Sequence, residues 1–92
     1  MAEITRQAQP VLSGLYRLQW EDVQQAWVLL YPEGMVRLNR PAGEILKRCD
    51  GATQVSALVD DLERAFGATN LRDEVQEFLT EASSRGWIEL AA

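Results

Sequence analysis

The chain has 92 residues, a formal net charge of −5 and 47% hydrophobic residues, which is typical of one small globular domain. It contains one cysteine and no histidine. Zinc and iron–sulfur clusters therefore lack a ligand set within the chain, and the commonest general base is missing. We expect no metal, no cofactor and no enzymatic activity.

No segment reaches the ~20 apolar residues that a membrane span requires, so we expect no membrane interaction. The N-terminal sequence MAEITRQAQP lacks the apolar core of a secretory signal. A single cysteine cannot form an internal disulfide, which fits a reducing compartment. These features together predict a cytoplasmic protein.

Charge is distributed unevenly along the chain. Residues 1–48 hold six basic and five acidic side chains, a net charge of +1, whereas residues 49–92 hold three basic and nine acidic ones, a net charge of −6. The second half therefore carries the acidity of the whole chain.

The first half predicts a small antiparallel sheet. Residues 1–9 are polar and without a period, so we expect a flexible arm followed by one domain over residues 10–92. Alternation predicts a half-buried strand over Leu15–Trp20. Ala26–Leu30 is apolar on both faces, as in a central strand, and Met35–Leu38 is a short edge strand.

The segment from residue 31 to residue 51 joins this sheet to the helices. Pro32 and Gly34 suit the second and fourth positions of a tight turn. Asn39 can cap a helix that begins near Pro41, and Gly51 is expected to end that helix in a left-handed conformation. The spacing predicts an apolar stripe formed by Ala42, Ile45, Leu46 and Cys49.

Two further helices and a short apolar segment complete the chain. Thr53 is expected to cap a helix that ends at Gly67, and Asn70 is expected to cap a helix that ends near Gly86. Residues 87–90 predict a strand or a packed tail. The fold class is therefore α+β, with a three-stranded antiparallel sheet followed by three helices that pack on one face of it.

Several strings of this sequence together resemble the PqqD family over about residues 10–88: YRLQW, LLYPEGMVRLNRPAGEILKRCDG, TQVSALVDDLERAFG and GW. That family supplies the peptide-binding component of pyrroloquinoline quinone (PQQ) biosynthesis, and its fold is described as winged-helix-like. The resemblance implies a non-catalytic recognition element for the leader segments of ribosomally made, modified peptides. It further implies that the chain binds a PqqA-type precursor peptide and presents it to a radical S-adenosylmethionine (SAM) enzyme of the PqqE type.

The resemblance also implies that the peptide lies between the third strand and the third helix. An edge strand presents unpaired N–H and C=O groups with which an extended peptide can pair, although an ordinary sheet edge would look the same in sequence. On the third helix, we choose the flank without acids, because donors suit an acidic peptide better than the row of Asp73, Glu74, Glu77 and Glu81. The predicted peptide-binding residues are Met35, Val36, Arg37, Leu38, Arg72, Val75, Gln76, Leu79 and Ser83.

Three questions stay open at this point. A winged-helix DNA-binding regulator is the alternative function, but the third helix holds two arginines against four acids over residues 71–85, which disfavours contact with phosphates. If the helices cover one face of the sheet, some of Tyr16, Trp20, Trp27 and Leu29 face the other way, but sequence does not decide which alternating set faces the helices. The outer face could be covered by the N-terminal arm around Val11 and Leu12, or it could serve self-association or enzyme docking. The chain is a monomer or a homodimer, and Cys49 is expected to be a small buried hydrophobe.

Overall fold

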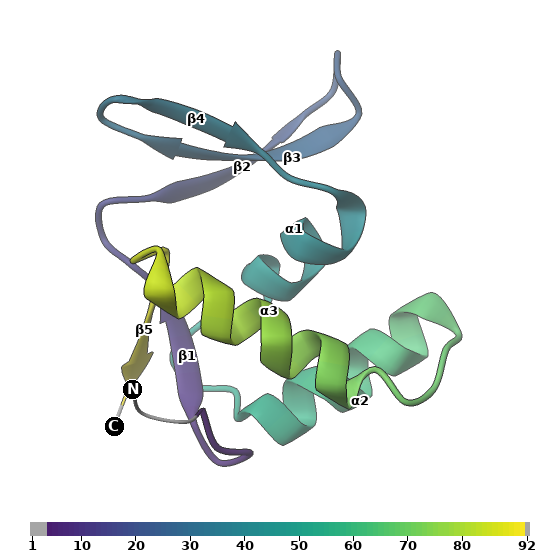
Figure 1. Cartoon of the computed structure of the whole chain (residues 1–92). Helices are drawn as coiled ribbons and strands as arrows, with labels where there is room; N and C mark the ends of the chain where they lie inside the picture. Colours follow the sequence, from purple (N-terminus) through teal and green to yellow (C-terminus); the bar gives the residue numbers. More distant parts are fainter. Residues whose placement is uncertain (1–3, 92) are drawn as a thin grey trace.

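The computed structural model describes residues 4–91 of the chain. Four strands come first: β1 (Gln9–Leu12), β2 (Arg17–Glu21), β3 (Ala26–Tyr31) and β4 (Gly34–Arg37). Three helices follow, α1 (Arg40–Lys47), α2 (Val55–Phe66) and α3 (Arg72–Ser84), before β5 (Ile88–Ala91). Figure 1 shows the sheet of β2, β3 and β4 above the helices, with α1 nearest to the sheet. The α+β fold class is confirmed.

The three-stranded sheet has the order β2-β3-β4, so β3 is central and β2 and β4 are its edges, as predicted. Both ladders are antiparallel. Pro32 and Glu33 form the two-residue turn between the paired residues Tyr31 and Gly34. The predicted meander is confirmed to within two residues at its boundaries.

A second, two-stranded sheet was not expected. β1 pairs with β5 in antiparallel register, from Gln9 opposite Ala91 to Leu12 opposite Ile88. Val11 and Leu12 therefore lie in this second sheet, opposite Glu89 and Ile88, and the aromatic set is not left for them to cover, because Tyr16 and Trp27 pack against the main core on the helix side. The pairing joins the two ends of the chain, and such long-range pairing leaves no local pattern in sequence. The winged-helix description holds only loosely for this reason.

Trp27 and Leu29 answer the question of which sheet face meets the helices. The backbone of Gly43 in α1 lies directly against the Trp27 ring, so a β-carbon at residue 43 would collide with it. Leu29 is fully buried in the main core. Val28, on the opposite face, is also buried, but it is not part of that core and its cross-strand neighbours are Gln19 and Arg37.

The helix ends agree with the sequence only in part. Asn39 caps α1 as predicted, since its Oδ1 accepts a hydrogen bond from the Ala42 N–H at 2.9 Å. Gly67 ends α2 in the left-handed conformation, with φ of 61°. Gly51 does not end α1, which stops at Lys47 with Arg48 as its C-cap; Gly51 instead donates its N–H to the Pro10 carbonyl.

The two other predicted caps are wrong. Gln54 precedes α2 without a side-chain cap, and Thr53 instead donates its hydroxyl to the Asp50 carboxylate at 3.1 Å. Leu71 precedes α3, also without a side-chain cap, because Asn70 adopts a positive φ of 60° in the turn before the helix. A side-chain contact in the loop takes Thr53 away from the cap position, and the left-handed backbone of the turn takes Asn70 away.

Residues 4–9 pack against the helices, whereas the sequence led us to expect an unpacked arm over residues 1–9; residues 1–3 of that arm lie outside the described part. Ile4 is 4% exposed and belongs to the main core. The carbonyls of Arg6 and Ala8 accept hydrogen bonds from Ser56 and Val55 at the start of α2. One apolar side chain among polar ones shows no periodicity, so sequence did not reveal this anchor.

The main core lies between α1, α2, α3 and the inner face of the sheet. Its fully buried members include Leu29, Leu58 and Leu79, and the helical stripes of α1 and α2 supply most of the others, as predicted. Among the helices of residues 4–91, none is long and apolar enough to span a membrane.

Candidate functional site

The outer edge of β4 has backbone groups that no other strand of the described chain uses. Leu38 donates its N–H to the Trp27 carbonyl at 2.9 Å. In an antiparallel ladder, hydrogen-bonded and non-bonded pairs alternate, so the N–H of Val36 also points toward β3. The N–H groups of Met35 and Arg37 therefore point outward, spaced as an added strand requires.

The sheet has two edge strands, β2 and β4, and they differ in how polar their side chains are. In β2, the exposed or half-buried side chains Arg17, Gln19 and Glu21 make the strand largely polar. In β4, Arg37 is the only charge, and Met35 exposes 51% of its surface. Charged side chains discourage strand addition, so β4 is the more receptive edge.

An apolar pocket of about 200 Å³ begins at Asn39, two residues after the last residue of β4. It lies between the first turns of α1 and α3 and the end of α2. Its lining is mostly apolar and comprises Asn39, Pro41, Ala42, Ile45, Leu62, Phe66, Leu71, Glu74, Val75 and Phe78. A pocket of this volume and lining suits one apolar side chain.

Two of the residues that line this pocket, Phe66 and Phe78, are aromatic, and Phe78 contacts Trp87 outside the lining. Phe66, Phe78 and Trp87 are half-buried against the core. The rings of Phe78 and Trp87 are 6.4 Å apart, and the Arg40 guanidinium lies 5.5 Å from the Phe66 ring centre. Half-buried aromatic rings are surfaces on which a peptide side chain can pack.

The structure separates the residues that sequence grouped on α3. Val75 lines the pocket but is 3% exposed, and Leu79 is fully buried, so both belong mainly to the core. Gln76 donates its side-chain N–H to the Ile4 carbonyl. Arg72 lines a different depression, with Arg6 and residues of α2.

The donor flank of Arg72, Gln76 and Ser83 therefore faces away from the pocket, and the sequence-based choice of flank is not the one that borders it. The flank that does border the pocket contains Leu71, Glu74 and Phe78. On a helix at about 100° per residue, the sequence shows both flanks but not which one meets the sheet. The N-terminal segment packs on the flank that contains Gln76, which leaves the other flank to border the pocket. This contact joins residues 72 positions apart, so no local sequence pattern indicates it.

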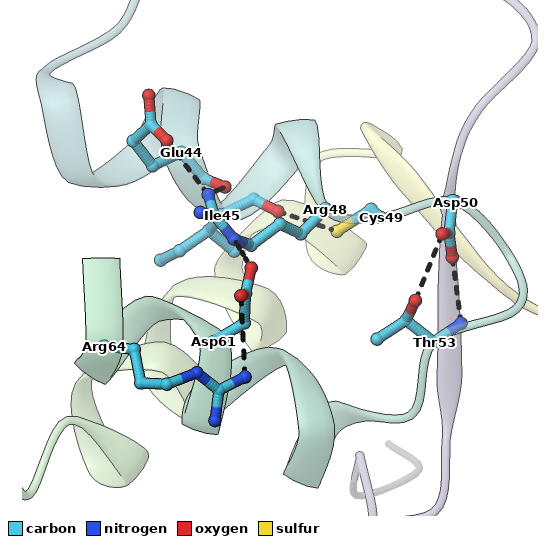
Figure 2. A network of polar contacts seen from close by, with 8 residues as sticks. All are labelled: Glu44, Ile45, Arg48, Cys49, Asp50, Thr53, Asp61 and Arg64. Carbon is cyan, nitrogen blue, oxygen red and sulfur yellow. Dashed lines mark hydrogen bonds and ion pairs between the residues drawn. The ribbon is translucent and has the colours of Figure 1, made fainter. Parts of the chain in front are cut away.

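A polar network holds α1 and α2 together behind this pocket (Figure 2). Arg48 lies between two carboxylates, with its Nη1 2.9 Å from Glu44 and its Nε 2.5 Å from Asp61. Glu44 also accepts the Trp27 indole N–H at 3.0 Å. The network therefore ties β3, α1 and α2 in one chain of contacts.

These contacts shift the pKa values of both carboxyls. Burial acts to raise the pKa of Glu44, but hydrogen bonds from Arg48 and Trp27 outweigh it and hold the pKa below its ordinary value. The hydrogen bond from Arg48 likewise lowers the pKa of Asp61. Both groups are thus anionic at neutral pH and matched by Arg48.

Cys49 offers no reactive thiol. Its side chain is buried, and its Sγ donates to the Ile45 carbonyl at 3.3 Å. Burial raises the pKa of the thiol to about 12, so the nucleophilic thiolate is scarce at neutral pH. Within residues 4–91, no group of three or more acidic or cysteine side chains is placed to hold a metal ion.

Comparison with known proteins gives a consistent result. Residues 26–88 match the family model described as coenzyme PQQ synthesis protein D (PqqD). The chain is 48% identical to the PqqA binding protein of Methylococcus capsulatus, over 84% of this chain and 83% of the relative. It is 44% identical to the PqqA binding protein of Azotobacter vinelandii, over 98% of this chain and 99% of the relative.

A solved structure has the same fold. It is the solution structure of the PqqD part of Methylobacterium extorquens PqqCD, which represents a functional, stand-alone recognition element for ribosomally synthesized and post-translationally modified peptides. The TM-score is 0.73 and the sequence identity is 27%, with 87% of each chain covered. The fold is therefore that of a peptide-recognition element.

Proposed function

Because the chain belongs to the PqqD family, we propose that it binds a PqqA-type precursor peptide along the outer edge of β4. The observation that carries this proposal is the outward pair of N–H donors at Met35 and Arg37, next to an apolar pocket. Main-chain pairing would supply affinity, and one side chain in the pocket would supply specificity.

The family is one of non-catalytic peptide-binding proteins, so the prediction that the chain is not an enzyme is confirmed. The chemistry would then belong to a partner. We propose that the chain presents the bound peptide to a radical SAM enzyme of the PqqE type in the cytoplasm, and that tethering raises the local concentration of substrate at that enzyme. The DNA-binding alternative gains no support, since the exposed face of α3 is acidic.

A pair of variants at Met35 tests the strand-edge proposal. Met35→Pro removes one outward donor and places a ring on the edge, whereas Met35→Ala keeps the donor and removes only the side chain. Losing one hydrogen bond and gaining a steric block is expected to weaken binding about tenfold. Calorimetric titration with a synthetic PqqA-type peptide measures both. Equal affinities for the two variants would contradict pairing at β4.

Presentation is tested separately. The rate at which a PqqE-type enzyme modifies the peptide should rise when the parent chain is added and should rise less with Met35→Pro. A rate that is independent of the chain would contradict presentation while leaving peptide binding intact.

A further inference from the structure

A second and larger cavity, of about 740 Å³, opens where β4 leaves β3 and the chain turns into α1. Its walls come from the β2–β3 hairpin, from the residues that lead out of β4, and from α1. It meets the apolar pocket at Asn39, which lines both. Its lining includes the aromatic residues Trp20 and Trp27 and the charged residues Arg37, Arg40 and Glu44.

Two tryptophans form the aromatic wall of this cavity. The Trp20 and Trp27 rings are edge to face, with their centres 5.4 Å apart, and Trp20 is 42% exposed. Both indole N–H groups are already used, by Asp22 and by Glu44. The rings therefore offer apolar and π surface to a ligand and no free donor.

Two arginines line the cavity, and the Arg40 guanidinium also lies over the Phe66 ring of the apolar pocket. Neither Arg37 nor Arg40 has a carboxylate within 4.0 Å among the described residues. The one acid in the lining, Glu44, is matched by Arg48. The acids of the nearby hairpin, Glu21 and Asp22, do not line the cavity and accept hydrogen bonds from Gln19 and Trp20. An excess of positive charge is thus concentrated here, on a chain whose net charge is −5.

We infer that this cavity binds an acidic flank of the same peptide that pairs with β4, an inference that rests on the proposed function. Arg37 and Leu38 belong both to the predicted docking strand and to the cavity lining. A strand advances about 3.3 Å per residue, so the peptide reaches the cavity within a few residues beyond Leu38. Its carboxylates would meet the two guanidinium groups, which suit them in bidentate geometry, and an apolar side chain would rest on Trp20.

Charge-neutralising variants test this inference. Arg37→Gln/Arg40→Gln removes both charges, Arg37→Lys/Arg40→Lys keeps them, and Arg17→Gln removes an exposed charge of β2 that lies outside the cavity. Affinity for a synthetic PqqA-type peptide is measured by calorimetry at ~50 and ~500 mM salt, where screening differs strongly. Each variant is also titrated with a peptide whose flanking acids are replaced by the corresponding amides.

The double glutamine variant is expected to bind about fivefold more weakly at low salt, as two exposed ion pairs would require, and the difference should shrink at high salt. The lysine variant should retain most of the affinity, Arg17→Gln should match the parent, and the amide peptide should not discriminate between parent and double glutamine variant. Parent-like binding by the double glutamine variant at low salt, with the β4 amides still shifting in NMR spectra, would overturn the inference and leave the proposed function standing. A peptide that fails to bind the parent would contradict the proposed function itself.

Discussion

The sequence of α3 does not show which of its two flanks borders the apolar pocket, but in the fold only one of them does. One flank, with Arg72 and Gln76, faces the N-terminal segment, and Gln76 holds the Ile4 carbonyl. The other, with Leu71, Glu74 and Phe78, borders the apolar pocket beside the end of β4. The composition of a helix flank therefore does not show whether the flank is available for binding. That depends on which other segments of the chain pack against it.

The basic residues near the end of β4 are not the ones that the sequence indicated on α3. Donors at Arg72 and Gln76 suit an acidic peptide, but they lie on the flank that faces the N-terminal segment, away from the apolar pocket. Near the end of β4, the positive charge comes instead from Arg37 and Arg40, which belong to the strand and to the start of α1. A peptide that pairs with β4 would thus meet apolar side chains from α3 and positive charge from the strand end.

The largest expected effect is on the open flank. Phe78→Ala removes an aromatic ring from the lining of the apolar pocket and should weaken peptide binding tenfold or more, as is typical of an aromatic anchor residue. Arg72→Ala, on the covered flank, is the matched control and should bind within about twofold of the parent. Calorimetry measures both, and circular dichroism checks that each variant is folded. The reverse ranking would place the peptide on the Arg72 flank.

A smaller effect is expected on the covered flank, and it concerns stability. Gln76→Ala removes the hydrogen bond to the Ile4 carbonyl and should lower the free energy of unfolding by about 1 kcal/mol. Peptide affinity should stay unchanged for the folded variant. Denaturant unfolding and calorimetry together make this comparison. A loss of affinity without a loss of stability would show that Gln76 contacts the peptide.

The smallest expected effect comes from the polar network behind the pocket. The pKa values of Glu44 and Asp61 are lowered in the folded chain from ordinary values of 4.5 and 3.8. Their contribution to stability is therefore present above the ordinary values and is lost as the pH falls through the folded ones. Arg48→Met should reduce the pH dependence of the unfolding midpoint between about pH 5 and 3. An unchanged pH profile would show that the network adds no acid-sensitive stability.

Local sequence predicted most of the elements because their signals are local. The turn at Pro32, the Asn39 cap and the Gly67 end of α2 each depend on one or two residues with specific backbone preferences. The alternation and helical spacing that define β3 and α2 follow from side-chain burial on one or two faces. The edge position of β4 could be deduced from the order of three short strands.

The rest depends on contacts between distant segments. The pairing of β1 with β5 and the burial of Ile4 join the N-terminal segment to the helical half. Thr53 and Asn70 have the chemistry of caps, but the loops that contain them use these residues otherwise. The flank of α3 that borders the pocket follows from those same contacts, which is why three of the five predicted residues on α3, Arg72, Gln76 and Ser83, lie on the flank away from it.

Amide hydrogen exchange tests most directly whether the peptide pairs with the outer edge of β4, because neighbouring N–H groups of this strand point alternately toward β3 and away from it. In the free chain, the amide of Val36 should be protected by β3, whereas those of Met35 and Arg37 should exchange quickly. On saturation with a PqqA-type peptide, Met35 and Arg37 should gain protection of at least about tenfold while Val36 changes little. Protection gained along β2 instead, with Met35 and Arg37 still exchanging as in the free chain, would contradict peptide pairing at the edge of β4.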